Sequence, residues 1–252
     1  MTELGLAVHK TETVNRPESV EALGAARPEV VAVCAFGQLI KEPLLSEHLM
    51  LNVHPSLIPR WRGAAPIERT LMAGDERSGV TIMRVTEDLD AGPVALQEEI
   101  AVREDDDYGS LSARLADLAG EVLLRSLDRL AEGSLEFEDQ DDSLATYAEK
   151  VQPEERHLDP ARPAAELERT VRALNPHIGT HLELDGGDWL GVRAARAVAA
   201  GPPPGEIAVE GEQLLLGCAE GALRLDQVQP SGGRPMAAAE FLRGHSAPSR
   251  AE

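Results

Sequence analysis

Asn52 and His54 are the residues of this 252-residue chain whose types and spacing most directly suggest chemistry. They lie in residues 50–54, which are predicted to form a strand that Pro55 ends. Residues two apart on a strand face the same side, so an amide and an imidazole would lie next to each other. Both groups can donate to an oxygen that gains negative charge during attack on a carbonyl, and imidazole also moves protons near neutral pH. The pair therefore predicts carbonyl chemistry at the end of a strand.

A carboxylate that orients the imidazole would complete such a site, and the candidate is Asp90. It lies in the turn Asp88-Leu89-Asp90-Ala91-Gly92-Pro93, which follows a predicted strand. No serine or cysteine stands in a recognisable nucleophile elbow. Acyl transfer without a covalent enzyme adduct is therefore the simplest interpretation.

Each of these features also has a purely structural interpretation. An Asn-x-His pair is common in proteins, and an aspartate before Ala-Gly-Pro is favoured as a turn residue. Arg60 and Arg62, which flank Trp61, could form a plain surface loop. The spacing alone leaves these alternatives open.

The segments that must position these residues alternate between strand and helix patterns. Runs rich in valine and alanine predict buried strands. Helices are predicted where a proline could occupy the first helical turn, where a glycine could follow the last turn, or where leucines recur along one helical face. Alternation of this kind predicts an α/β domain built on a largely parallel sheet, with ligands at the carboxyl ends of its strands. The predicted order is helix 17–26, strand 30–35, strand 50–54, helix 65–73, strands 79–86 and 94–102, and a long helix that ends near Ala131.

The second half of the chain has a different pattern. An acidic stretch with Gln140-Asp141-Asp142 is predicted to be a linker, and a helix over 163–174 follows it. Short runs punctuated by turns then predict about five strands, which favours a small barrel or sandwich. These strands are expected at 180–184, 189–198, 206–209, 214–218 and 222–228.

Charge divides the chain at the same place. The formal net charge is −20, of which residues 160–252 carry only −3, with 12 acidic and 9 basic residues. Phosphate binding needs cations, so the acidity argues against a broad nucleic-acid footprint on the first part. A hydrophobic content of 42% excludes a disordered chain. The two cysteines, Cys34 and Cys218, cannot build a disulfide framework, and their expected role is packing. No cluster of metal-ligating residues in the sequence suggests a metal site.

The expected location is the cytoplasm. No apolar run is long enough for a transmembrane helix, so no membrane partner is expected. The first residues lack the basic and apolar regions of a signal peptide.

The run Asn52 to Ile67, continued by Leu89-Asp90-Ala91-Gly92, closely resembles the methionyl-tRNA formyltransferase family. By this resemblance Asn52, His54 and Asp90 match the family's catalytic trio. The family's loop reads Ser-Leu-Leu-Pro, and here Ile58 replaces the second leucine. The resemblance implies a tetrahydrofolate-binding loop at Ser56, Leu57, Ile58 and Pro59, and a segment along the pterin at Ala35, Phe36, Gly37 and Gln38.

The resemblance also implies the architecture. A Rossmann-like formyltransferase domain with a mostly parallel sheet is expected over 1–138, a linker over 139–160 and a smaller OB-like β-barrel, tRNA-binding domain over 161–252. Family members begin with strands that have no counterpart here, and Gly5-Leu6-Ala7-Val8 stands in the place of their third strand. We therefore interpret the sequence as a fragment or a mis-started reading frame, of a protein expected to be a monomer when full length.

The function that the resemblance implies is formyl transfer from 10-formyltetrahydrofolate to the α-amine of methionyl-initiator tRNA. Residues 62–67, 145–150 and 171–176 resemble the tRNA-directed members rather than the sugar-directed ones. The candidates for tRNA backbone contacts are Arg162, Arg169, Arg172, Arg193 and Arg196. Two alternatives are a sugar-nucleotide N-formyltransferase, which would use the same trio, and an inactive folate- or tRNA-binding remnant.

Overall fold

The computed structural model describes residues 5–251 of the chain. Residues 1–4, where the sequence analysis found no signal-peptide pattern, lie outside the described residues. The chain forms two compact units. The first consists of Met1–Ala64, Gly79–Glu98 and Leu118–Tyr147, and the second of Ala65–Ser78, Glu99–Asp117 and Ala148–Glu252.

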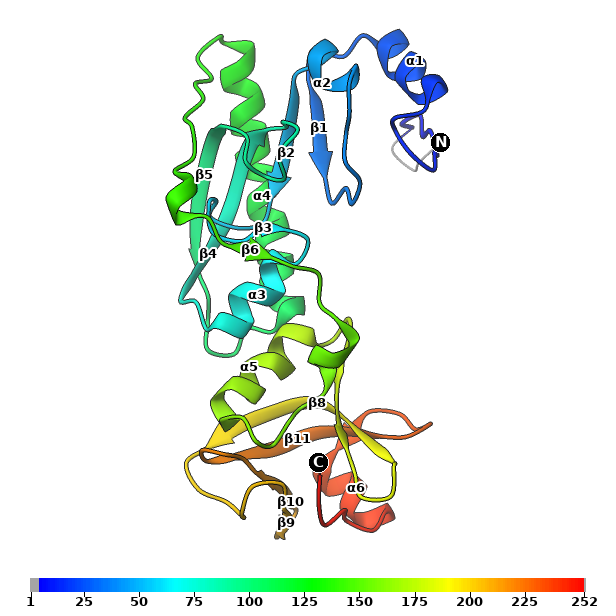
Figure 1. Ribbon diagram of the computed structural model, residues 1–252, viewed down its shortest axis with the longest axis vertical. Coiled ribbons are helices and arrows are strands. Elements are labelled where there is room, and N and C mark those ends of the chain that lie inside the picture. Colours follow the sequence, from blue (N-terminus) through cyan, green and yellow to red (C-terminus); the bar gives the residue numbers. More distant parts are fainter. Residues whose placement is uncertain (1–4, 252) are drawn as a thin grey trace. The chain divides into compact units, whose positions relative to one another are not determined.

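A four-stranded sheet organises the first unit (Figure 1). Its order is β1 (Val31–Cys34), β2 (Met50–His54), β4 (Arg77–Arg84) and β5 (Val94–Ala101). Strand β2 lies between β1 and β4, and its residues Met50, Leu51 and Val53 are buried. The strand that carries Asn52 and His54 is therefore internal and has a neighbour on each side.

The sheet is mixed, which corrects the expectation of a mostly parallel sheet. Strands β1 and β2 are parallel, with Val33 opposite Asn52, whereas β2 and β4 are antiparallel, with His54 opposite Thr81. The connection from β4 to β5 has only nine residues, 85–93, and a parallel crossover needs about a dozen or more. Alternating strand and helix patterns identify an α/β domain but do not specify in which direction each strand runs. The α/β class itself is confirmed.

The helices begin and end close to the predicted residues. Helix α1 (Pro17–Ala26) begins at a proline, whose fixed φ suits a first turn, and α3 (Pro66–Ala73) ends at Gly74. Gly74 has φ of 74°, and its N–H donates to carbonyls of the last turn of α3. Helix α4 (Tyr108–Ala131) ends at the predicted residue, and α2 (Leu44–Glu47) is too short to leave a periodic pattern.

Residues 5–8 do not form a strand in the structure, although they stand where the resemblance places one. Leu6 and Val8 are exposed, and no strand of the described sheet pairs with this segment. A strand needs the ladder hydrogen bonds of a neighbour. An apolar pattern by itself does not provide that neighbour.

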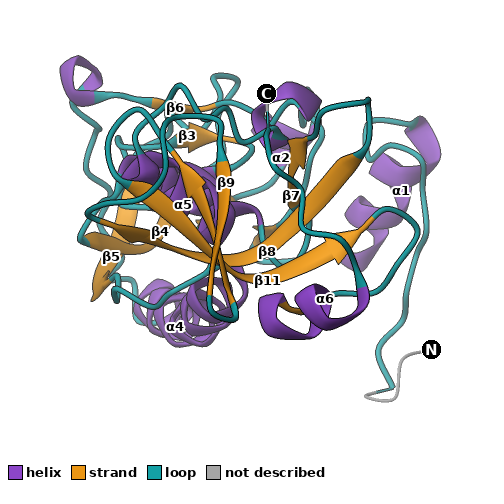
Figure 2. Cartoon of the chain, turned by 90° about the horizontal axis from the view of Figure 1, so that it is seen from below, coloured by secondary structure: helices purple, strands orange, loops and turns teal. Residues whose placement is uncertain are grey.

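An antiparallel sheet organises the second unit (Figure 2). Helix α5 (Ala164–Leu174) contributes Leu167 and Val171 to one continuous apolar core with the sheet. The short helix α6 (Ala238–Gly244) adds Phe241 to this core and was not predicted. The strand order is compatible with the predicted OB-like barrel. It runs β7 (Thr180–Glu183), β8 (Trp189–Val198), β11 (Ala222–Pro230), β10 (Gln213–Gly217), β9 (Ile207–Glu210), with β12 (Met236–Ala237) on β11.

The expected linker, 139–160, is structured at its start. Strand β6 (Tyr147–Ala148) pairs with β3 (Arg62–Gly63), and two 3₁₀ turns occupy Asp142–Leu144 and Pro153–Arg156. Residues 139–147 therefore belong to the first unit rather than to a free connection. No helix among the described residues is both long and apolar enough to cross a lipid bilayer.

Helix α4 provides a test of the packing. Leu115 is 1% exposed and Leu124 is 63% exposed on the same helix. We expect Leu115→Ala to lower the free energy of unfolding by about 2–5 kcal/mol, because it leaves a cavity. Leu124→Ala removes the same atoms from a solvated position and should change it by no more than about 0.5 kcal/mol. Urea titrations followed by circular dichroism measure both, and equal effects would show that the buried stripe is assigned wrongly.

Candidate active site

Asn52 and His54 occupy the carboxyl end of the internal strand β2. His54 is buried and Asn52 is half-buried. The buried residues Leu51 and Val53 alternate with them, so the apolar side chains fix which face of the strand the polar pair occupies. The amide and the imidazole thus lie on one face of the sheet at the carboxyl end of β2, as their spacing predicts.

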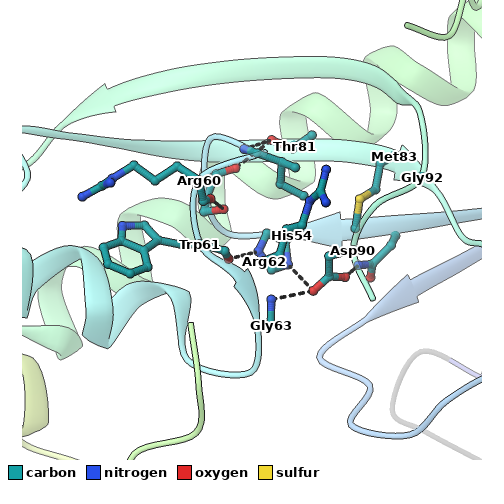
Figure 3. Close-up of polar contacts among 12 residues, drawn as sticks. His54, Arg60, Trp61, Arg62, Gly63, Thr81, Met83, Asp90 and Gly92 are labelled. Atoms are coloured by element: carbon teal, nitrogen blue, oxygen red, sulfur yellow. Dashed lines mark hydrogen bonds and ion pairs between the residues drawn. The ribbon is translucent and has the colours of Figure 1, made fainter. Parts of the chain in front are cut away.

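Asp90 meets this pair from the turn after β4 (Figure 3). Its Oδ1 accepts a hydrogen bond from Asn52 Nδ2 at 3.2 Å. Its Oδ2 lies 3.6 Å from His54 Nδ1 and accepts from the backbone N–H of Gly63 at 2.8 Å. One carboxylate therefore joins β2, the loop after β2 and the turn after β4. The structure thus brings Asp90 into contact with Asn52, which lies 38 residues earlier in the chain, and with its neighbour His54.

The hydrogen bonds of His54 determine what its ring can do. Its Nε2 lies 2.8 Å from the carbonyl oxygen of Trp61, and a carbonyl only accepts, so Nε2 carries a hydrogen. In the neutral ring the lone pair is then on Nδ1, which faces the Asp90 carboxylate. Burial lowers the pKa of His54, while Asp90 and the Trp61 carbonyl raise it, and the net direction is down. The ring is thus a proton acceptor whose accepting atom points at a carboxylate.

Trp61 holds an uncommon backbone conformation to provide that carbonyl. Its φ is 66°, which costs a non-glycine residue about 1–3 kcal/mol. Hydrogen bonds on both sides of the residue fix it: its N–H donates to Thr146 Oγ1 at 2.9 Å, and its carbonyl accepts from His54. Thr146 also bonds through its backbone to Pro59 and Arg62. The segment after α4 therefore sets the shape of the loop next to His54.

The loop that follows β2 rests on a buried polar network. The hydroxyl of Ser56 donates to the Arg60 carbonyl at 2.7 Å, and Thr81 Oγ1 donates to the Ser56 carbonyl at 2.7 Å. Gln97 donates from Nε2 to Thr81 Oγ1 and to the Ile58 carbonyl. The first of these bonds closes the loop on itself, and the bonds to the Ser56 and Ile58 carbonyls tie it to β4 and β5, so its backbone is held in one conformation.

The predicted folate-binding loop is therefore only partly available to a ligand. Ser56 and Ile58 are buried and hold the loop from inside, whereas Leu57 and Pro59 are half-buried. Contact with a ligand would come from Leu57, Pro59 and backbone groups.

The predicted pterin segment lies beyond the end of β1 and is open to solvent. Ala35, Phe36, Gly37 and Gln38 are all exposed, and Ala35 has φ of 48°. A cavity of about 80 Å³ is lined by Phe36 and Gln38 from this segment and by Asn52, Asp90 and Gly92. Two of the three predicted catalytic residues, Asn52 and Asp90, thus share a cavity with part of the predicted pterin segment, whereas His54 is buried and does not line it.

Two residues that hold the site were not recognised from the sequence. Gln140 lies in the predicted linker and bonds to both Arg62 and the Asp90 turn. Arg62 was assigned to a plain surface loop as one alternative, but it is only 3% exposed. A buried arginine needs polar partners, but the sequence alone carries no signal that Arg62 is buried.

The five arginines expected to contact tRNA all make contacts within the protein. Arg162 pairs with Glu166, Arg172 with Glu168 and Arg196 with Asp226. Arg169 donates to the Met72 carbonyl and Arg193 to Gln229. Arg162 and Arg196 have the most exposed side chains among the three ion-paired arginines, at 46% and 74%. These two are the most accessible of the ion-paired candidates for a phosphate group.

The cysteines and metal-type ligands add nothing to this site. Cys34 is exposed at the end of β1, and Cys218 is buried in the core of the second unit, where burial raises the pKa of its thiol to about 11. Within residues 5–251, no three His, Cys, Asp or Glu side chains are grouped as a metal ion would require.

Comparisons with known proteins identify the family to which the chain belongs. Residues 7–127 match the family model described as formyl transferase, and residues 150–246 match the formyl transferase C-terminal domain. The chain is 41% identical over 248 residues to a methionyl-tRNA formyltransferase of Methylococcus capsulatus, covering 97% of this chain and 80% of that protein. It is 42% identical over 238 residues to one from Ectopseudomonas mendocina, covering 93% and 76%.

Solved structures share the fold at lower identity. HypX from Aquifex aeolicus in complex with tetrahydrofolic acid superimposes with a TM-score of 0.69 at 20% identity, covering 92% of this chain and 43% of HypX. This chain thus spans less than half the length of HypX. A 4-N formyltransferase from Francisella tularensis superimposes with a TM-score of 0.60 at 20% identity, covering 66% and 70%.

The contact between His54 and Asp90 can be tested without any ligand. Asp90 raises the pKa of His54, so Asp90→Asn should lower the His54 pKa further below its ordinary value. NMR titration of the imidazole nitrogens measures this shift, with His54→Gln to assign the signal. Asp117→Asn, which makes the same exchange at an exposed position of α4, should leave the titration unchanged. An unmoved His54 pKa in Asp90→Asn would mean that the two side chains do not interact.

Proposed function

Because the chain belongs to the methionyl-tRNA formyltransferase family, we propose that it transfers a formyl group from 10-formyltetrahydrofolate to the α-amine of methionyl-initiator tRNA. The observation that carries the proposal is the contact of Asn52, His54 and Asp90 at the end of β2. An amide donor, an imidazole base and a carboxylate are what amine attack on a formyl carbon requires.

The surface around Asn52 offers groups that a folate donor could contact, although the cavity there, of about 80 Å³, would hold only a small part of such a molecule. Phe36, 39% exposed, offers an apolar surface for a flat ring, and the side chain of Gln38 and nearby backbone groups offer hydrogen bonds. Bound 10-formyltetrahydrofolate supplies the formyl carbon, which leaves N10 as the new bond to the amine nitrogen forms. The chain's residues must then stabilise the formyl oxygen and move one proton from the amine toward N10.

Asn52 is the proposed donor to the formyl oxygen. One N–H of its amide bonds to Asp90 Oδ1, which fixes the plane of the amide and leaves the other N–H for a ligand. A donor held in place before the reaction costs no reorganisation when charge develops on the oxygen. The Asn52–Asp90 bond therefore prepares the amide for this role.

His54 is proposed to take the proton of the attacking amine. Their residue types suggest that Asn52 and His54 both donate to the oxyanion, but the bond from His54 Nε2 to the Trp61 carbonyl leaves only Nδ1 for a reactant. Nδ1 bears the lone pair in the neutral ring, so it accepts a proton and then holds it beside the Asp90 carboxylate. Because burial lowers the pKa of His54, the base is neutral and ready near neutral pH.

The proposed acceptor is a charged tRNA rather than a sugar nucleotide. The relatives named above that act on methionyl-tRNA are about 40% identical over more than nine tenths of the chain. The match to the C-terminal domain over residues 150–246 also fits an acceptor larger than a sugar. A sugar-nucleotide acceptor and an inactive binding remnant become outcomes of the assay below.

Replacement of the oxyanion donor and the base tests the reaction. We expect Asn52→Asp and His54→Ala each to lower the single-turnover rate constant for formyl transfer to charged initiator tRNA by about 100-fold or more. Single-turnover assays with 10-formyltetrahydrofolate measure this, and His9→Ala, at an exposed histidine, should retain wild-type activity. Full activity in either site variant would remove that residue from the mechanism. Wild-type transfer only to an amino-sugar nucleotide, or to neither acceptor, would refute the proposed function.

The exposed arginines test the tRNA-binding part of the proposal. We expect Arg162→Ala with Arg196→Ala to raise KM for charged tRNA several-fold, leave kcat nearly unchanged, and lower the salt slope of binding by about 1 per arginine. The control is Arg77→Ala with Arg125→Ala, which removes two exposed, ion-paired arginines elsewhere. An equal change in KM for both pairs would attribute the effect to net charge and overturn the assignment.

A further inference from the structure

The side-chain amide of Gln140 connects two parts of the active site. Its Oε1 accepts from Arg62 Nε at 3.0 Å and from Arg62 Nη2 at 2.7 Å. Its Nε2 donates to the backbone carbonyls of Asp90 at 2.9 Å and Gly92 at 2.6 Å. The amide thus uses both of its N–H donors and both acceptor positions. A side chain engaged this fully has one orientation available.

The turn that Gln140 holds has an uncommon backbone conformation. Asp90 has φ of 48°, in the left-handed region, which only a few types of residue other than glycine tolerate. A Cβ at Gly92 would lie 1.9 Å from the Arg84 carbonyl oxygen, so the backbone passes too close for any side chain. A turn under these constraints needs external bonds to stay in place. The two bonds from Gln140 go to the carbonyls of these two residues.

Arg62 provides the other anchor. Its side chain is 4% exposed, and it pairs with Asp142 as well as with Gln140. Its neighbour Gly63 donates to the Asp90 carboxylate. Removal of a partner from a buried charge is costly, so Arg62 strongly favours the conformation in which Gln140 and Asp142 face it. A closed chain of contacts therefore runs from Arg62 through Gln140 to the Asp90 turn, and back through Gly63.

We propose that Gln140 is a positioning residue, which fixes the Asp90 turn against Arg62 so that the carboxylate points at Asn52 and His54. Its effect on catalysis rests on the proposed function, but its effect on the Asp90–His54 contact does not. Gln140 acts through Asp90, and misplacement of a reacting group by about 1 Å can cost about 100-fold in rate.

The direct test is Gln140→Met, which keeps the length of the side chain and adds no charge. Asp90 is the charged group that acts on the His54 ring, and the Trp61 carbonyl is its backbone partner. If the turn moves away, the His54 pKa should fall toward its value in Asp90→Asn, as NMR titration of the ligand-free protein measures. In assays of formyl transfer, kcat should fall by about 10- to 100-fold, with each KM within about twofold of the wild type.

A second variant covers the case in which Gln140→Met does not fold. Gln140→Glu still accepts from Arg62, so Arg62 keeps its partner, but the carboxylate cannot donate to the Asp90 and Gly92 carbonyls. Because the new ion pair with Arg62 offsets only part of the loss of these two bonds, we expect the variant to fold with a lowered unfolding midpoint and to show the same fall in kcat. Gln213→Met and Gln213→Glu, at an exposed position of β10, are the matched controls and should change neither quantity.

The proposal is overturned if folded Gln140→Met or Gln140→Glu keeps the wild-type kcat, or if Gln140→Met loses activity while its His54 pKa stays at the wild-type value. The second result would mean that Gln140 stabilises the fold without orienting Asp90. If the wild-type chain transfers no formyl group, the proposed function fails, and the NMR titration still decides the positioning role.

Discussion

One carboxylate organises the active site. Asp90 accepts from the Asn52 amide and the Gly63 N–H, and it lies against His54 Nδ1. Its partners come from the end of β2 and from the loop that follows it. Each of these segments has its own ties to the sheet, and the carboxylate joins them around the polar pair. The geometry on which the proposed chemistry depends is therefore the geometry of one side chain.

Holding this carboxylate in place requires an uncommon backbone and buried polar groups. Asp90 and Trp61 both have positive φ, and the residues that fix them, Gln140 and Thr146, come from the same segment after α4. Buried polar groups are costly unless they are hydrogen-bonded, and Arg62, Ser56 and Thr81 are all paired. Unfavourable local conformations at a site are retained when the surrounding bonds over-determine them. Here the surrounding bonds also determine which nitrogen of the neutral His54 ring carries the hydrogen and which has the lone pair.

Much of this arrangement could be predicted from local patterns. Strand β2 and helix α1 have the predicted bounds, because proline punctuation and apolar runs are local signals. The spacing of Asn52 and His54 predicts their shared face, and the resemblance to a family points to Asp90. The segment 140–148 could not be recognised in this way. Its acidic composition is typical of a linker, and its role depends on partners at Arg62 and Asp90, which are far away in sequence.

The direction of β4 and the conformation of residues 5–8 also could not be predicted from the sequence. A strand pattern records which residues are apolar, whereas strand direction depends on how the connecting segments lead the chain. Likewise, Leu6 and Val8 satisfy an apolar pattern, but a ladder needs a neighbour. Both differences concern pairing partners, which local composition does not specify.

A crystal structure of this chain, with the separation of Asp90 Oδ2 and His54 Nδ1 as the measured quantity, tests the account most directly. The account predicts a separation near 3.6 Å, with Asn52 bonded to the other carboxylate oxygen and Nε2 bonded to the Trp61 carbonyl. A carboxylate that is turned away, more than about 6 Å from the ring, would exert little influence on it and would contradict the account.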